Sequence, residues 1–202
     1  MTDYGSGWTE CRATWNKGAT GVVEQIKTIE QALPFTLKGF DCDNGSEFLN
    51  YHLLSYFQGH PNVIKFTRSR PYKKNDNAHV EQKNWTHVRQ LFSYDRFDNK
   101  SLINLMNNLY SKEWSQLQNY FFPSMKLKEK TRINSRYKKK YEEPQTPYQR
   151  LIDSNDIDEE QKSKLQAQFK KLDPFKLKAR IEKKLKAIFE LMSVTQNVRL
   201  RI

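Results

Sequence analysis

A helical pattern flanked by two short apolar runs constrains the fold of this chain most. In residues 17–33 the apolar side chains recur at three- and four-residue steps, and Pro34 ends the predicted helix. Residues 7–15 alternate roughly between apolar and polar, and residues 35–42 form another apolar run, so both are predicted strands. Strand, helix and strand form a βαβ unit, in which the two strands should be parallel with a right-handed crossover. The sequence therefore predicts an α/β fold for the first half of the chain.

Asp43 stands directly after the second predicted strand. Open α/β sheets place their ligand-binding groups at the carboxyl ends of strands. A carboxylate at this position provides hard oxygen ligands for a divalent cation. The tripeptide Asp43-Asn44-Gly45 is also a common turn, so a purely structural role stays open.

A second carboxylate, Glu81, lies near the start of a helix predicted over residues 77–94. Asn84 and Trp85 follow at three- and four-residue steps and share its face, with Arg89 at the edge of that face. We expect Trp85 to pack toward the sheet. A glutamate in the first turn of a helix also compensates the helix dipole, which is the alternative role for Glu81.

A polar, basic loop, residues 67–76, joins these two carboxylates along the chain. Its cations and its aromatic residue are Arg68, Arg70, Tyr72, Lys73 and Lys74. Arginine and lysine neutralise phosphates and an aromatic ring stacks on bases, so the combination is typical of nucleic-acid binding. A solvated surface loop is the alternative interpretation.

The charge of the whole chain points to the same class of partner. Its 202 residues carry a net charge of +12, which favours a polyanion such as nucleic acid or an anionic membrane. The sequence has no run of about 18 apolar residues, so no membrane-spanning segment is predicted. Its first residues lack the features of a signal peptide, and Cys11 and Cys42 fit a reducing cytosol. We therefore expect a cytoplasmic protein.

The character of the chain changes near Asp98. Residues 98–202 are predicted to be all helical and mostly basic, after an α/β domain over residues 1–97. A long amphipathic helix should end at Pro123, and Thr146-Pro147 and Asp173-Pro174 each combine a helix N-cap with a first-turn proline. The final helix should carry an apolar stripe formed by Leu177, Ile181, Leu185, Ile188 and Met192.

Two motifs resemble the catalytic core of the DDE integrases and transposases, the group that includes retroviral integrases. They are DNGSEF, which contains Asp43, and TRSRPYKKNDNAHVEQKN, which contains Glu81. The 37 residues between the two carboxylates are typical of that superfamily. The chain is most similar to bacterial insertion-sequence transposases, closely over residues 2–96 and more loosely in LYSKEWSQLQNYFFPSMKLKEK and YEEPQTPYQRLI.

The resemblance implies an RNase H-like fold and in-line transfer at a DNA phosphodiester. Two Mg²⁺ ions (or Mn²⁺), about 4 Å apart, would activate the attacking water or 3′-hydroxyl and stabilise the leaving oxygen. Asp43 matches the family's second carboxylate and Glu81 the third. Asn84 and Arg89 would contact DNA beside them, and the basic loop would hold the strand.

One element of the family pattern is expected to be missing. The family's first carboxylate lies on a strand upstream of the segment that corresponds to the start of this chain, and Asp3 does not match it. We therefore expect a partial RNase H-like core, a transposase fragment that is inactive alone. As in active relatives, it would work as a homo-oligomer on DNA or beside a complementing fragment. The alternatives are a non-catalytic nucleic-acid-binding protein and a structural subunit that completes a fragment carrying the missing aspartate.

Overall fold

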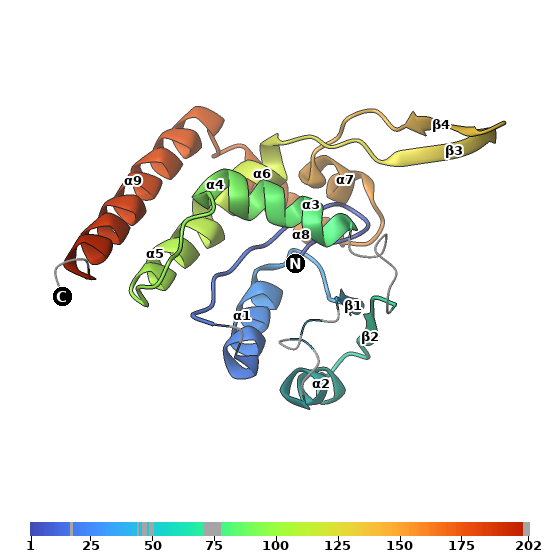
Figure 1. The fold of residues 1–202 in the computed structure, drawn as a ribbon. Helices are drawn as coiled ribbons and strands as arrows, with labels where there is room; N and C mark the ends of the chain where they lie inside the picture. The colour runs from blue at the N-terminus through green and yellow to red at the C-terminus, as the bar shows by residue number, and fades with distance from the viewer. Residues whose placement is uncertain (17, 44, 46–47, 49–50, 71–77, 200–202) are drawn as a thin grey trace.

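A computed structural model describes residues 1–16, 18–43, 45, 48, 51–70 and 78–199 of the chain. The described part is a mixture of helices and strands (Figure 1), with one parallel and one antiparallel two-stranded sheet. The predicted α/β class is compatible with this architecture. No helix in these ranges is both long enough and apolar enough to cross a lipid bilayer.

A small α/β unit lies at one end of the molecule (Figure 1). It comprises α1 (Ala19–Ala32), β1 (Gly39–Cys42), α2 (Tyr51–Gln58) and β2 (Lys65–Arg68). The two strands pair in parallel, with Phe40 opposite Phe66. These two rings stack with their centroids 6.0 Å apart. An apolar cluster joins residues of both helices, of β1 and of the segments before the strands: Val23, Ile26, Leu37, Phe40, Cys42, Leu53, Phe57 and Ile64. Phe66 of β2 packs against it.

The prediction of a strand over residues 7–15 is wrong. Within this segment only Thr9 makes a bridge, an isolated one to Thr2, and the parallel partner of β1 is β2. The backbone of the segment is instead paired by side chains of the second half. Asn119 accepts a hydrogen bond from the Thr9 N–H at 2.8 Å and donates to the Thr9 carbonyl at 2.9 Å. Asn107 does the same at Ala13, at 2.6 Å and 3.1 Å. Two amide side chains thus take the place of a neighbouring strand.

Two long helical runs and the last helix form the body of the molecule. The first run is α3 (Ala78–Asn84), η2 (Trp85–Arg89, π-helical) and α4 (Gln90–Phe92), and the second is α5 (Leu102–Leu109), η3 (Tyr110–Trp114, π-helical) and α6 (Ser115–Phe121). The predicted apolar stripe of α9 (Pro174–Arg199) is confirmed, and it shares one apolar cluster with both runs. The shared core is Leu91, Phe92, Leu102, Leu109, Tyr110, Leu117, Leu177, Ile181 and Ile188. Residues on both sides of Asp98 contribute to this core, and the domain boundary near Asp98 stays a prediction.

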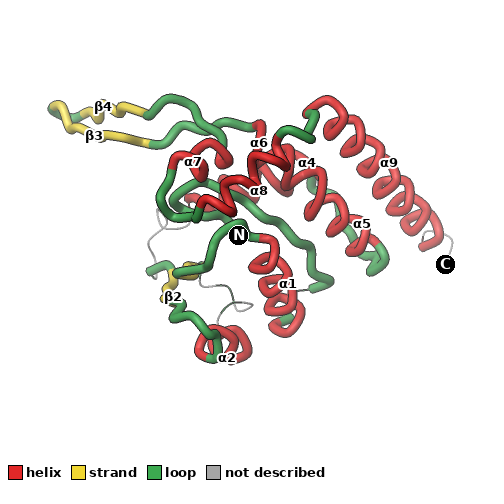
Figure 2. Tube along the Cα trace, turned by 180° about the vertical axis from the view of Figure 1, so that it is seen from behind, coloured by secondary structure: helices red, strands yellow, loops and turns green. Residues whose placement is uncertain are grey.

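The second half is not all helical. Residues expected to be helical or irregular form an antiparallel hairpin of β3 (Leu127–Ile133) and β4 (Arg136–Tyr141). Beside its lysines and arginines it carries Thr131, Ile133, Tyr137 and Tyr141, residue types that favour a strand. The turn begins at Asn134, whose φ of 54° lies in the left-handed region that asparagine tolerates. Seen from the reverse side, the hairpin extends away from the helices (Figure 2).

The predicted helix starts are confirmed. Thr146 forms a capping box with Gln149 at the start of α7 (Pro147–Asp153). The Asp173 carboxylate accepts hydrogen bonds from the backbone N–H groups of Phe175 and Lys176 at the start of α9. Between them lies α8 (Glu159–Phe169), so residues 146–173 connect the hairpin to the last helix. A third apolar cluster joins these helices to the N-terminal segment through Trp8, Tyr120, Leu151, Ile157 and Leu165.

Replacing Asn119 by alanine should destabilise the fold. The Asn119 side chain is fully buried, and its loss leaves the Thr9 N–H and carbonyl without their partner. We expect the free energy of unfolding to fall by about 3 kcal/mol, since each buried unpaired group costs about 1–3 kcal/mol. Denaturant unfolding measures this loss. Asn104→Ala, at an exposed position of α5, is the control and should change stability little. An equal effect of the two substitutions would contradict the role assigned to Asn119.

Candidate functional site

Asp43 lies where the β1–β2 ladder ends. Beyond the last strand pair, the backbone N–H of Ser69 still donates to the Cys42 carbonyl at 2.9 Å, so both chains run side by side up to Asp43. The Asp43 carboxylate accepts a hydrogen bond from the Gly45 N–H at 3.0 Å through Oδ1. The turn that the sequence offered as an alternative therefore exists. The same bond holds a partly exposed carboxylate at the carboxyl end of a parallel strand.

Arg68 pairs with Cys42, the residue before Asp43, at the end of the ladder. The pKa of the Cys42 thiol is raised to about 11, mainly by burial and also by the negative charges of Asp41 and Asp43, while the positive charge of Arg68 opposes the rise. Asp43 and Arg68 therefore both act electrostatically on the same residue. Arg70 is exposed two residues farther on. The three other predicted DNA-binding residues of this loop, Tyr72, Lys73 and Lys74, lie outside the described residues.

Glu81 and Asn84 are exposed on α3. Trp85, which follows on the same face, is exposed as well. Trp85 is 51% exposed, so the expectation that it packs toward the sheet is wrong. His87 is buried instead, with 4% of its surface exposed. The reason is the π-helical turn of η2, whose wider turn shifts the residues away from the 3.6-residue period.

Three side chains form an exposed cluster one turn beyond Glu81, which we name the Trp85 cluster: Trp85, Arg89 and Tyr94. The rings of Trp85 and Tyr94 have centroids 6.5 Å apart, and the Arg89 guanidinium lies 4.5 Å from the centre of the Tyr94 ring. Tyr94 is 70% exposed. Sequence reasoning included Arg89 but missed the two aromatic residues as surface groups. Tyr94 follows a backbone turn at Ser93, whose φ is 59°.

His87 holds the helix that carries Glu81 against the second helical run. Its carbonyl accepts a hydrogen bond from the Tyr110 hydroxyl at 2.9 Å, and its Nδ1 accepts one from the Trp114 indole N–H at 3.2 Å. The pKa of His87 is lowered to about 4, mainly by burial and also by the positive charge of Lys83. The imidazole is therefore neutral at pH 7, as an Nδ1 acceptor must be.

The two carboxylates fit a magnesium site by their chemistry, since Mg²⁺ prefers carboxylate oxygens. The first turn of α3 lies on the same side of the molecule as the β1–β2 ladder (Figure 1). Within the described ranges, however, no three His, Cys, Asp or Glu side chains gather closely enough to hold a metal ion. Asp43 and Glu81 would supply only part of a ligand set, and both their metal-binding role and their convergence stay predictions.

The chain was compared with known proteins. No family model matches it, and no solved structure matches it. It is similar to a protein of Sinorhizobium fredii (strain NBRC 101917 / NGR234) described as uncharacterized protein y4rM, with 37% identity over 150 residues. The matched region is 74% of this chain and 42% of that protein. The chain therefore spans less than half the length of this relative.

The stability of the fold should fall in acid because of His87. Its folded pKa of about 4 lies below the unfolded value of about 6.5, so the unfolded chain binds the proton first as the pH falls. The contribution of His87 to the free energy of unfolding is fully present above pH 6.5. About 3 kcal/mol of it is lost as the pH falls from about 6.5 to 4.

Denaturant unfolding at pH 7.5 and pH 4 measures this loss. His87→Asn keeps an acceptor for the Trp114 N–H but does not titrate. It should therefore reduce the difference in the free energy of unfolding between pH 7.5 and pH 4. His52→Asn, at an exposed position of α2, is the control and should leave the difference unchanged. An unreduced difference in His87→Asn would show that the acid sensitivity arises elsewhere.

Proposed function

We propose that this chain is part of a DDE-type transposase or integrase that acts in DNA integration and transposition. One observation carries the proposal. Asp43 stands at the carboxyl end of a parallel strand, Glu81 stands in the first turn of the helix after the next strand, and both occur in the motifs that resemble the family. We further propose that residues 1–97 belong to an RNase H-like core. Parallel pairing of β1 and β2 around α2 is compatible with such a core.

In this proposal Asp43 and Glu81 hold the catalytic metal, Mg²⁺ or Mn²⁺. The bound metal supplies Lewis-acid activation of a water or a 3′-hydroxyl that attacks a DNA phosphodiester. The Gly45 N–H orients the Asp43 carboxylate, and the exposed Glu81 side chain is accessible to a ligand from the first turn of α3. The family's first carboxylate, which neither Asp43 nor Glu81 matches, comes from outside the described residues or from a second polypeptide. Because two carboxylates neutralise less charge than three, the chain alone should cleave DNA weakly or not at all.

The DNA strand is held by groups on both sides of the carboxylates. Arg68 and Arg70 are exposed at the end of β2, where they neutralise phosphates. Asn84 lies one helical turn after Glu81, and the Trp85 cluster offers two exposed rings and a guanidinium for stacking on bases. The partners proposed are DNA and a second copy of the chain or a complementing transposase fragment, in the cytoplasm of a bacterium.

A non-catalytic DNA-binding protein is the second candidate. The basic hairpin of β3 and β4 favours it, because all residues of its strands are exposed and residues 127–141 include seven cations. This candidate needs no metal. Metal binding by Asp43 and Glu81 therefore separates the two functions.

Removing either carboxylate charge should weaken metal binding. Asp43→Asn keeps an oxygen that accepts the Gly45 N–H but removes the charge, so the turn should persist while the ligand is lost. We expect Asp43→Asn and Glu81→Gln each to weaken Mn²⁺ binding about tenfold, because Mn²⁺ binds hard, charged oxygen ligands. Titration calorimetry or the electron paramagnetic resonance of free Mn²⁺ measures the affinity.

Asp41→Asn is the matched control for these variants. Asp41 lies on β1 two residues before Asp43, and its carboxylate accepts a hydrogen bond from the Thr67 hydroxyl at 2.6 Å. The Asp41→Asn variant should bind Mn²⁺ with the affinity of the parent chain. If all three variants bind Mn²⁺ like the parent, the metal site is disproved and the non-catalytic function is favoured.

Truncating Trp85 should weaken binding of single-stranded DNA. The ring is half exposed, so Trp85→Ala should leave the fold intact while it removes a stacking platform. Stacking of one base on an aromatic ring contributes about 1–3 kcal/mol, so the dissociation constant should rise about 5- to 150-fold. Fluorescence anisotropy with a labelled oligonucleotide measures it. Phe175→Ala removes an 83% exposed ring from α9 and should have no effect. Equal affinities of the two variants would exclude Trp85 from the DNA-binding surface.

A further inference from the structure

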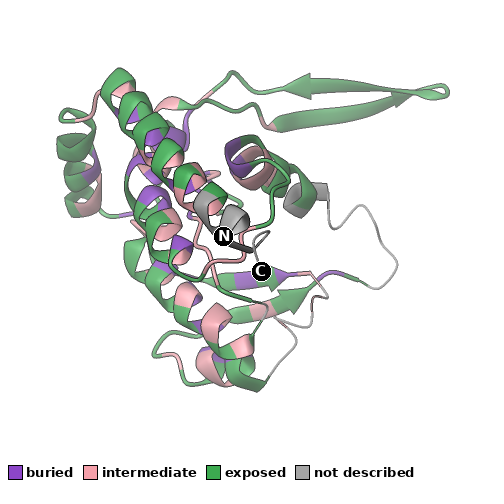
Figure 3. Cartoon of the chain, turned by 60° about the vertical axis from the view of Figure 1, so that its left-hand side comes forward, coloured by how far each residue is buried: buried purple, intermediate pink, exposed green. Residues whose placement is uncertain are grey.

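The β3–β4 hairpin is a two-stranded ribbon that contributes nothing to the apolar clusters described above. Every residue of both strands is exposed (Figure 3). The front and back views both show it extending away from the helices (Figures 1 and 2). An isolated two-stranded ribbon gains little stability in water, so its persistence requires support at the base or from a partner.

The ribbon carries half of the net charge of the protein. Residues 127–141 contain one carboxylate, Glu129, and seven cations, a net charge of +6 within the chain's +12. The cations are Lys128, Lys130, Arg132, Arg136, Lys138, Lys139 and Lys140. The register places Lys130 directly opposite Lys139. Like charges in that position destabilise a sheet, and an anionic partner would remove the repulsion.

Cations lie on both faces of the ribbon. Directly opposed residues share a face, and side chains alternate between the faces along each strand. The register therefore puts Lys130, Arg132, Tyr137 and Lys139 on one face and Thr131, Arg136, Lys138 and Lys140 on the other. The Lys130 ammonium lies 4.3 Å from the centre of the Tyr137 ring, as this assignment requires. A flat anionic surface such as a membrane would contact only one of these faces, whereas a groove with phosphates along both walls contacts both.

The dimensions of the ribbon match a groove of duplex DNA. Two strands lie about 4.8 Å apart, and a seven-residue strand is about 23 Å long. The major groove of B-DNA is about 12 Å wide and admits a two-stranded ribbon. The minor groove is about half as wide.

The base of the ribbon is fixed to the body by hydrogen bonds. Ser124 and Gln145 exchange backbone hydrogen bonds at 2.9 Å and 3.3 Å. The buried Arg150 donates to the Ser124 hydroxyl at 3.0 Å and to the Ser6 carbonyl at 3.3 Å. Lys126 donates to the Tyr4 carbonyl at 3.0 Å. These contacts set the direction of the ribbon, because they tie both of its ends to α7 and the N-terminal turn.

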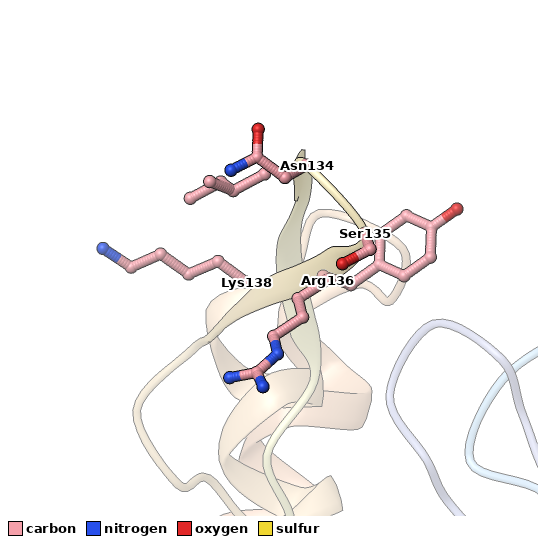
Figure 4. A pocket seen from close by; sticks show the side chains of 6 residues that line it. Asn134, Ser135, Arg136 and Lys138 are labelled. Atoms are coloured by element: carbon pink, nitrogen blue, oxygen red, sulfur yellow. The ribbon is translucent and has the colours of Figure 1, made fainter.

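The tip of the ribbon presents hydrogen-bonding side chains. An open hollow of about 510 Å³ is lined by Ile133, Asn134, Ser135, Arg136, Tyr137 and Lys138. Figure 4 shows the Lys138 and Arg136 side chains extending outward from the strand, with the Asn134 amide at the turn. Asparagine pairs with the edge of adenine and arginine with that of guanine in the major groove.

We propose that the β3–β4 hairpin is a DNA-binding ribbon that enters the major groove of double-stranded DNA. The cations of its two faces contact the phosphates of the two walls, and the tip with Asn134 and Arg136 faces the base edges. This inference goes beyond the proposed function and uses neither Asp43 nor Glu81. Duplex binding is therefore measured in the presence of EDTA, so that its outcome does not depend on the metal site.

The test measures affinity of the full chain for a labelled 20-base-pair duplex by fluorescence anisotropy at several salt concentrations. One variant, Lys130→Gln with Lys139→Gln, removes charge from one face, and Lys138→Gln with Lys140→Gln removes it from the other. Each should weaken binding and lower the slope of log affinity against log salt by about 1.8, because each lost phosphate contact contributes about 0.9. The control, Lys176→Gln with Lys183→Gln, removes two exposed lysines from α9 and should leave the slope unchanged.

Three outcomes would overturn the proposal. The first is unchanged duplex affinity in both ribbon variants. The second is weaker duplex binding in only one of the two face variants, which indicates a surface that contacts one face of the ribbon and not a groove that contacts both. The third is preferential binding to phosphatidylserine vesicles, lost in the ribbon variants while duplex affinity is retained. Because the substituted residues are exposed, all variants should unfold at the temperature of the parent, which circular dichroism checks.

Discussion

The buried side chain of Asn119 is the constraint on which the rest of the structure depends. It pairs with both backbone groups of Thr9, 110 residues away in the chain. This contact draws the N-terminal segment across the second helical run, where Trp8 packs edge-on against Tyr120 with ring centroids 5.5 Å apart. The segment in turn contacts the base of the hairpin through the carbonyls of residues 4–6. One amide thus connects the first residues to both the helical core and the ribbon.

A buried charge accompanies this amide. Glu10 is 2% exposed, and its carboxylate accepts hydrogen bonds from the Trp8 indole N–H at 3.2 Å and from the Ser115 hydroxyl. Arg12 balances its charge at 3.2 Å. A buried carboxylate is tolerated only where such partners surround it. The polar groups of the N-terminal segment are therefore satisfied by the helices rather than by a sheet.

The sequence predicted those features that local interactions determine. The apolar stripe of α9 and the caps at Thr146 and Asp173 depend on neighbours within a few residues, and all are present. The strand over residues 7–15 was predicted wrongly because its partners are amides from far along the chain. The ribbon was missed because a dense run of lysines gives no apolar alternation. In the candidate site, Asp43 and Glu81 were predicted from their motifs and their joint role stays a prediction, whereas the π-helical turn that exposes Trp85 and buries His87 has no simple sequence signal.

The exposed ribbon is also a place where the backbone can be cut while the rest of the fold stays together. The core and the third cluster join residues before the ribbon, such as Leu117 and Tyr120, to residues after it, such as Leu177 and Leu151. A protease that cleaves after lysine or arginine meets seven exposed lysine and arginine residues on the ribbon, and a cut there separates no packed surface. The two pieces would remain associated through their shared interior. The same geometry makes the turn at Asn134 a natural position for new chain termini in a circular permutant.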